Sequence, residues 1–178
     1  VGALAEAKCA DVCDALCAPD SDSFDADPGA LLVVGCDSML EINGAMQGKP
    51  HTPEVARERI RAMRGTTATL WTGHSVALLT PRSSSDRAGS GSRTAAARLT
   101  RSASTQVHFG QITDAEIDAY VATGEPLRVA GSFTVDGLGG PFIDGVTGDY
   151  HSVVGISLPL LRSMATEMGI FWPDLWDT

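Results

Sequence analysis

Apolar residues recur along the 178-residue chain with two different periods, which predict a mixture of helices and strands. A helical period, or a capping residue ahead of an apolar run, predicts helices over residues 4–16, 52–64, 114–123 and 158–168. Thr113 and Glu116 have the spacing of a capping box, which defines the start of the third helix. Thr52 can cap the second helix in the same way, ahead of Pro53 in its first turn.

Strands are expected between these helices. Residues 30–36 form a continuous apolar run, typical of a strand buried on both faces, and this would place Asp37 at the carboxyl end of the strand. Ligands bind at that end in open α/β sheets, so Asp37 is a candidate site residue by position. Asn43 and Gly44 form a hairpin-turn signal after it. Further strands are predicted over residues 66–79, 105–109 and 141–144.

The composition is that of one globular α/β or α+β domain covering residues 1–178. The chain is 43% hydrophobic and 20% charged, and it contains no apolar run of the roughly 20 residues that a membrane-spanning helix needs. Its first residues also lack the basic and apolar regions of a signal peptide. We therefore expect a soluble, cytoplasmic protein with no membrane partner.

The net charge of −9 argues against a broad nucleic-acid-binding face, and nucleic acid is not an expected partner. Arginine is nevertheless concentrated in residues 82–103, where five arginines accompany one acid in a segment rich in Ser, Gly and Ala. Because this segment has no apolar periodicity, we interpret it as a flexible insertion between two strands. An arm that grips phosphate or a partner is the alternative.

Three of the four cysteines recur at every fourth residue, namely Cys9, Cys13 and Cys17, and would lie along one face of the first helix. Neighbouring positions on one helix are poorly oriented for a disulfide, and no CxxC pair or nearby His completes a four-ligand metal site. We expect reduced, buried cysteines, with a metal cluster as the alternative.

Several stretches, taken together and in order, resemble the Maf family, and the resemblance covers roughly residues 4–165. They are Leu4-Ala5-Glu6-Ala7-Lys8, Gly35-Cys36-Asp37-Ser38, Gly48-Lys49-Pro50, Met63-Arg64-Gly65 with Thr72-Gly73-His74, Tyr120-Val121-Ala122-Thr123-Gly124-Glu125-Pro126, Ala130-Gly131-Ser132-Phe133, and Gly148-Asp149-Tyr150-His151-Ser152-Val153-Val154-Gly155.

The resemblance implies an α/β fold of the Maf or ITPase-like type, with an elongated mixed β-sheet flanked by helices and a central cleft. It implies hydrolysis of nucleoside triphosphates, standard or modified, to monophosphate and pyrophosphate, as a form of nucleotide house-cleaning. The family is also associated with inhibition of septum formation, and its members often look like homodimers. The family's N-terminal Ser-rich loop with paired arginines is absent from the sequence. We therefore expect an N-terminally truncated Maf-like domain, and the alternative function is a catalytically impaired nucleotide-binding or cell-division regulatory protein.

Cleavage between the α and β phosphates requires a base or metal that activates water, and cations that hold the leaving pyrophosphate. The resemblance assigns the proton acceptor to Asp37, acting directly or through a divalent cation, Mg²⁺ or Mn²⁺. It assigns phosphate contacts to Lys8 and Lys49, the only lysines in the chain. The alternatives are an aspartate that caps a turn, a covalent aspartyl nucleophile, and surface lysines.

Base selection is assigned by the resemblance to Ser38 and Asp136. Members that prefer thymidine and uridine triphosphates usually have Thr and an amide at these positions, whereas an acid is more similar to relatives that act on methylated guanine nucleotides. A carboxylate accepts hydrogen bonds only, which suits the N–H donors of a guanine edge. Asp136 as a plain turn residue beside Gly137 is the alternative.

Overall fold

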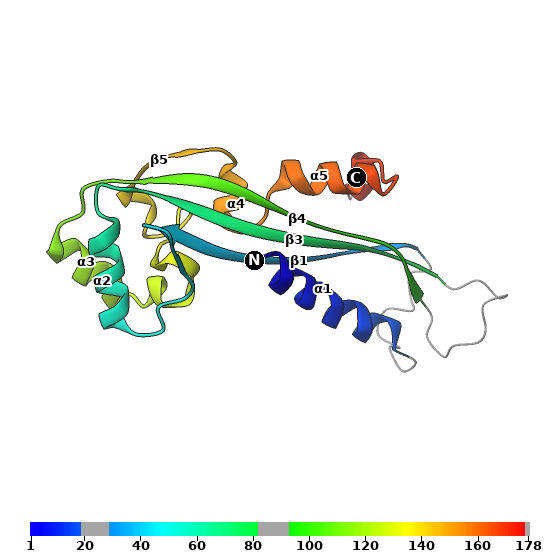
Figure 1. The fold of residues 1–178 in the computed structure, drawn as a ribbon, viewed down its shortest axis with the longest axis horizontal. Helices are drawn as coiled ribbons and strands as arrows, with labels where there is room; N and C mark the ends of the chain where they lie inside the picture. Colours follow the sequence, from blue (N-terminus) through cyan, green and yellow to red (C-terminus); the bar gives the residue numbers. More distant parts are fainter. Residues whose placement is uncertain (19–28, 82–92, 177–178) are drawn as a thin grey trace. The chain divides into compact units, whose positions relative to one another are not determined.

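The computed structural model describes residues 1–18, 29–81 and 93–176 (Figure 1). They fold into two compact units, one made of residues 1–18, 29–37, 73–81, 93–102 and 159–176, the other of residues 38–72 and 103–158. In chain order the elements are α1 (Gly2–Cys17), β1 (Leu31–Ile42), β2 (Ala45–Gln47), α2 (Pro53–Met63), β3 (Thr67–Pro81), β4 (Arg93–Phe109), α3 (Asp114–Ala122), the 3-10 turns η2 (Glu125–Arg128), η3 (Ala130–Ser132) and η4 (Gly140–Phe142), β5 (Ile143–Thr147), α4 (Tyr150–Val154), α5 (Leu158–Glu167) and η5 (Trp172–Leu175).

The strands form one five-stranded sheet in the order β2-β1-β3-β4-β5. The pairs β1–β2 and β4–β5 are antiparallel, with Leu40 opposite Gln47 in the first and Gln106 opposite Thr147 in the second. This sheet with flanking helices confirms the expected α/β class. A membrane-spanning helix needs about 20 apolar residues, and no helix of the described residues meets that requirement.

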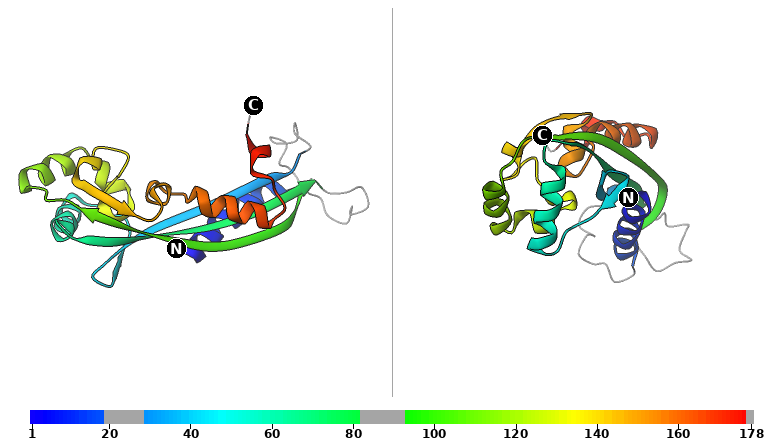
Figure 2. Two further views of the ribbon diagram at one scale, coloured as in Figure 1. Left: turned by 90° about the horizontal axis from the view of Figure 1, so that it is seen from above. Right: turned by 60° about the vertical axis from the view of Figure 1, so that its left-hand side comes forward.

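The first unit is built on the packing of α1 against the sheet. Buried residues of α1, β1 and β3 form its core cluster: Cys9, Cys13, Val33, Ala77 and Leu79. The views in Figures 1 and 2 agree that α5 lies on the opposite face of this part of the sheet from α1. All four cysteines are free, and Cys9 and Cys13 are buried, which confirms that these two cysteines are core residues of a helix.

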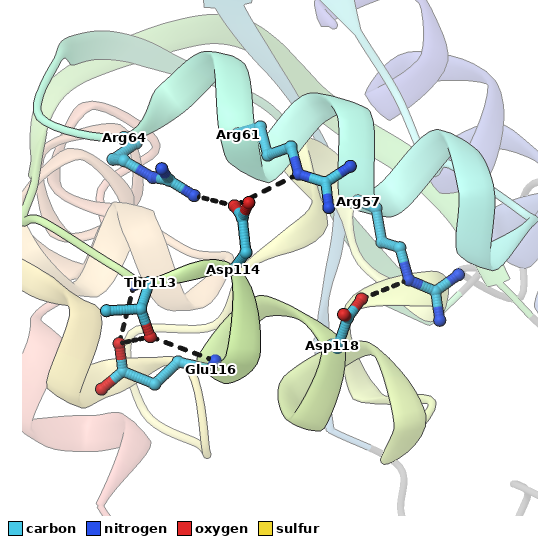
Figure 3. Close-up of polar contacts among 7 residues, drawn as sticks. All are labelled: Arg57, Arg61, Arg64, Thr113, Asp114, Glu116 and Asp118. Carbon is cyan, nitrogen blue, oxygen red and sulfur yellow. Dashed lines mark hydrogen bonds and ion pairs between the residues drawn. The ribbon is translucent and has the colours of Figure 1, made fainter.

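The second unit has a larger apolar core, in which α2 and α3 lie side by side (Figures 1 and 2). Figure 3 shows how exposed ion pairs align the two helices. Arg57 forms an ion pair with Asp118 at 2.7 Å. Asp114 forms ion pairs with Arg61, at 3.3 Å, and with Arg64. Hydrogen bonds from these two arginines lower the pKa of Asp114. Such exposed pairs contribute little stability individually, so the core holds the helices together and the pairs mainly set their alignment.

Local sequence signals set several boundaries as predicted. The Thr113 hydroxyl accepts from the backbone N–H of Glu116, and the Glu116 carboxylate accepts from the backbone N–H of Thr113. The predicted capping box of α3 is therefore confirmed. Thr52 caps α2 by accepting from the backbone N–H of Val55 at 3.4 Å. Asn43 and Gly44 have φ angles of +51° and +76°, as the tight turn between β1 and β2 requires.

The strand predicted over residues 30–36 is longer than expected. β1 continues to Ile42, so Asp37 lies inside the strand and the prediction that it ends the strand is wrong. Burial in the first half alternates, with Val33 and Gly35 buried, so the strand is not buried on both faces. The polar pair after Cys36 suggested a strand end, but tertiary partners satisfy these side chains and Leu40 resumes the buried pattern.

The prediction of a flexible insertion over residues 82–103 is wrong for its second half. β4 begins at Arg93 and runs to Phe109, while residues 82–92 lie outside the described residues. β5 pairs only with residues 106–109, so β4 borders the sheet before them, where exposed Ser, Thr and Arg side chains are well tolerated. Arg93 is buried and donates to the carbonyl of Gly29, and Arg101 pairs with Glu167 at 2.6 Å.

Candidate functional site

Asp37 and Lys8 meet in the first unit because α1 approaches β1 very closely. The approach depends on Gly35, where a Cβ atom would lie 2.5 Å from the carbonyl oxygen of Ala5 and 2.7 Å from the amide nitrogen of Cys9. No other residue fits between helix and strand at this point. The Lys8 side chain, on the same turn of α1, is thereby brought against the strand.

The Lys8 ammonium lies 2.6 Å from Oδ1 of Asp37 and also donates to the carbonyl of Cys36 at 3.0 Å. The Asp37 side chain is 17% exposed and that of Lys8 is 55% exposed, so the carboxylate is largely shielded while the ammonium reaches solvent. An ammonium has three hydrogens. Within the described residues two are used, so one remains for a further acceptor such as a phosphate oxygen.

Ser38 belongs to the second unit and hydrogen-bonds there to Thr72, with 2.9 Å between the two hydroxyl oxygens. The buried Thr72 hydroxyl donates to the backbone carbonyl of Ser152 at 3.1 Å. A hydroxyl has one proton, and a carbonyl can only accept, so the proton shared between Ser38 and Thr72 comes from Ser38. Ser38 is therefore left with lone pairs only and can act toward a ligand as an acceptor.

The carbonyl of Ser152 is held in place by the cap of α4. Asp149 accepts from the backbone N–H of His151 at 3.0 Å and contacts its Nδ1 at 3.1 Å, while its own backbone pairs with the hydroxyl of Thr105. Desolvation raises the pKa of Asp149, but hydrogen bonds from Ser157 and His151 outweigh it, and the pKa is lowered. The segment from Gly148 to Gly155 thus positions the carbonyl that accepts from Thr72, and through Thr72 it orients the Ser38 hydroxyl.

Lys49 is exposed on a shaped turn between β2 and α2. The carbonyl of Gly48 accepts from Arg59 at 2.7 Å and from the backbone N–H of Gly131 at 3.4 Å. Pro50 is buried on the other side, and His51 has a positive φ of 65°. These contacts hold the backbone of the turn while leaving the lysine side chain in solvent.

Asp136 is exposed at the tip of the loop formed by residues 134–139. The loop is anchored by Glu125, a residue that sequence reasoning placed in a family stretch without giving it a role. Its carboxylate accepts hydrogen bonds from Tyr120, Thr134 and the backbone N–H groups of Leu138 and Gly139. The crowding of glycines after residue 130 was the one sequence signal of so tight a loop.

The structure therefore brings together Lys8 and Asp37, and it does not join the other predicted residues directly. Among the described residues, no hydrogen bond or ion pair links Ser38, Lys49 and Asp136 to one another. Sequence reasoning assigned no role to Thr72 or Glu125. Thr72 contacts Ser38, 34 residues away along the chain, and Glu125 contacts the backbone of the loop through hydrogen bonds that no residue pattern indicates.

The donor set at Asp37 suits a cation that arrives with a phosphate ligand. Mg²⁺ is commonly held by one or two carboxylates, with phosphate oxygens and water completing the octahedron. Asp37 offers one carboxylate, and the described residues contain no group of three or more His, Cys, Asp or Glu side chains placed to hold an ion. The residues around Asp37 therefore fit a cation that is bound mainly by the phosphates of the triphosphate.

Comparison with known proteins gives a consistent result over almost the whole chain. The family model described as "Maf-like protein" matches residues 1–168. A nucleoside triphosphate pyrophosphatase of Nocardia farcinica (strain IFM 10152) is 48% identical over 173 residues, which cover 97% of this chain and 73% of that protein. One of Rhodococcus erythropolis (strain PR4 / NBRC 100887) is 44% identical over 182 residues, covering 100% of this chain and 75% of that protein.

A longer protein of Bifidobacterium longum (strain NCC 2705) contains a similar region. This nucleoside triphosphate pyrophosphatase/Nudix hydrolase fusion protein is 48% identical over 147 residues, which cover 82% of this chain and 27% of the fusion. The chain thus spans about three quarters of the length of the Nocardia and Rhodococcus relatives and a smaller part of the fusion.

Proposed function

The chain belongs to the Maf-like protein family, and from that premise we propose that it hydrolyses nucleoside triphosphates to the monophosphate and pyrophosphate. The observation that carries the proposal is the pair of Lys8 and Asp37, a shielded carboxylate in direct contact with a half-exposed ammonium. This arrangement combines a proton acceptor with a cation for phosphate oxygens, the two elements that attack on the α phosphorus requires.

In the proposed reaction Asp37 accepts the proton of the attacking water. Lys8 holds one oxygen of this carboxylate at 2.6 Å and so orients the other oxygen toward its task. The third hydrogen of the ammonium is available to a phosphate oxygen whose charge grows as pyrophosphate leaves. Lys49, exposed on its shaped turn, supplies a second cation for the phosphates. A divalent cation carried by the triphosphate would neutralise further charge, with Asp37 as its protein ligand.

Base recognition is proposed for Ser38 and Asp136. Ser38 gives its proton to Thr72, which leaves its hydroxyl oxygen as an acceptor toward a ligand. The carboxylate of Asp136 can only accept, so both residues offer acceptors to a base. A base edge with adjacent N–H donors, as in guanine, matches two acceptors better than the edge of thymine or uracil, where a single N–H lies between two carbonyl groups. Guanine-type triphosphates are therefore the preferred substrates in this proposal.

Asp37→Asn tests the mechanism, because it keeps the shape of the side chain and removes the proton acceptor. We expect kcat/KM for pyrophosphate release to fall by about 10² to 10⁴, the usual contribution of a general base. Asp14→Asn, the same chemical change at an exposed position of α1, is the matched control and should leave the rate unchanged.

The identity of the product separates this function from its competitors. Pyrophosphate and nucleoside monophosphate should appear in equal amounts from a panel of triphosphates with Mg²⁺ or Mn²⁺. Release of orthophosphate with a phospho-aspartyl intermediate would indicate a covalent phosphatase. An Asp37→Asn variant as active as the parent would show that the mechanism is wrong.

A further inference from the structure

The carboxylate of Glu125 accepts four hydrogen bonds. Three come from the loop of residues 134–139, which carries Asp136, and the fourth comes from Tyr120. Oε1 accepts from the Tyr120 hydroxyl at 3.1 Å, from the Thr134 hydroxyl at 2.5 Å and from the backbone N–H of Gly139 at 3.2 Å. Oε2 accepts from the backbone N–H of Leu138 at 3.2 Å. The Glu125 side chain thus binds the loop at Thr134, two residues before Asp136, and at Leu138 and Gly139, which follow it.

The Tyr120 and Thr134 hydroxyl oxygens also lie 3.4 Å apart, but a carboxylate can only accept, so each hydroxyl directs its one proton to Glu125 and none is left for the contact between them. Tyr120 donates its hydroxyl proton to Glu125 and accepts from the backbone N–H of Thr134 at 3.2 Å. Thr134 donates its hydroxyl proton to Glu125 and accepts from the N–H of Gly139 at 3.3 Å. Desolvation raises the pKa of Glu125, but the four hydrogen bonds outweigh it and the pKa is lowered. The ionised carboxylate suits this network, because the four contacts all come from donors and neither of its oxygens carries a proton that would itself need an acceptor.

The loop packs closely against this carboxylate at two glycines. A Cβ atom at Gly137 would lie 2.9 Å from Oε1 of Glu125 and 2.8 Å from the Thr134 hydroxyl. A Cβ atom at Gly139 would lie 2.6 Å from the Tyr120 hydroxyl. Tyr120, which binds Glu125, belongs to α3. The start of α3 is capped, and the ion pairs in Figure 3 align this helix with α2.

We propose that Glu125 is a positioning residue for base recognition, because its carboxylate sets where the loop places Asp136. The proposal rests on the proposed function and deepens it, since it explains how an exposed aspartate on a loop can discriminate between bases. Discrimination needs the acceptor held within a fraction of an ångström of its productive place. Asp136 has no hydrogen-bond partner of its own among the described residues, so its placement depends on the loop backbone, and the loop backbone depends on Glu125.

Glu125→Gln is the sharpest perturbation, because it changes one oxygen into an NH₂ group with almost no change in shape. If the remaining oxygen keeps the three contacts of Oε1, the NH₂ group faces the N–H of Leu138, and two donors then repel each other. We expect the KM of the best triphosphate to rise about tenfold and the ratio of kcat/KM between best and worst triphosphates to fall at least about fivefold, with kcat nearly unchanged.

Glu116→Gln is the matched control, since it makes the same carboxyl-to-amide change in the capping box of α3 and touches no residue of the loop. It should lower the melting temperature without altering KM or base preference. A double-mutant cycle adds a test of mechanism. In an Asp136→Ala background, Glu125→Gln should change KM less than about twofold, because the residue through which it acts is gone.

The outcomes separate this inference from the proposed function. An active parent whose Glu125→Gln variant loses kcat equally for all bases, with KM and base preference retained, overturns the inference alone, since that pattern indicates a merely structural role. A parent that releases no pyrophosphate overturns the proposed function. In that case the inference is tested by titrating α,β-methylene triphosphate analogues of the four bases calorimetrically. The inference is supported if the parent binds one base more tightly than the others and Glu125→Gln reduces that difference in affinity. It is overturned if the parent binds all four bases equally or binds none.

Discussion

Replacing Gly35 with alanine would test whether the close approach of α1 to β1 builds the pair of Lys8 and Asp37. The added Cβ atom would lie 2.5 Å from the carbonyl oxygen of Ala5, where ordinary contact begins at 3.4 Å, so α1 must retreat by roughly 0.9 Å. Two of the three close atoms are backbone atoms of the helix, and a side-chain rotation cannot relieve them. Inserting a methyl group into such a contact typically costs about 1 to 3 kcal/mol, and we expect a value of about 2 to 3 kcal/mol here.

The same retreat would lengthen the contact between Lys8 and Asp37, which is now 2.6 Å. A displacement of about 1 Å at a catalytic group can cost 10²-fold in rate. Lysine has a flexible four-carbon stem that can follow part of the movement, so a fall of about tenfold in kcat/KM is the expected result.

Urea denaturation and initial rates of pyrophosphate release, measured on the same preparations, give both quantities. Gly145→Ala is the control, because a Cβ atom there meets nothing within 4 Å, and its stability should stay within about 0.5 kcal/mol of the parent. A Gly35→Ala protein as stable as that control would refute the described packing. A destabilised protein whose folded fraction keeps full activity would show that the position of α1 does not govern the site.

Three further predictions concern the second unit. Thr113→Ala removes the cap of α3 and should lower the free energy of unfolding in urea by about 1 kcal/mol; a change below about 0.3 kcal/mol would contradict the cap. Thr72→Val leaves the carbonyl of Ser152 without this donor and frees the proton of Ser38, so stability should fall by about 1 to 3 kcal/mol and base preference should shift, whereas Thr72→Ser should retain both. The folded-state pKa of Glu125 lies below its ordinary value of 4.5, so this group stabilises the fold above about pH 4.5 and loses that effect as the pH falls through the lowered pKa. The stability difference between the parent and Glu125→Gln should therefore narrow in acid, and a constant difference between pH 7 and pH 3 would argue against the network.

The pair of Lys8 and Asp37 shows how much of the candidate site can be predicted from residue patterns. The resemblance selected Lys8 and Asp37 separately, and the structure places them in contact although they are 29 residues apart. Nothing within a few residues of either one encodes that contact, which depends on the absence of a side chain at Gly35. Likewise, the proton arrangement that makes Ser38 an acceptor depends on Thr72 and on the carbonyl of Ser152, 80 residues beyond Thr72.

The sequence by itself determined the features whose causes lie within one or two turns of chain, such as the capping box at Thr113, the Asn43–Gly44 turn and the cap at Thr52. Only the tertiary structure decided that β1 continues past Asp37 and that β4 begins at Arg93. The physical reason is that strands are held by backbone hydrogen bonds to neighbouring strands, so a polar segment can be a strand when a partner edge is available. The anchoring of the Asp136 loop by Glu125 was also decided there, since its hydrogen bonds join groups brought together by the packing of α3.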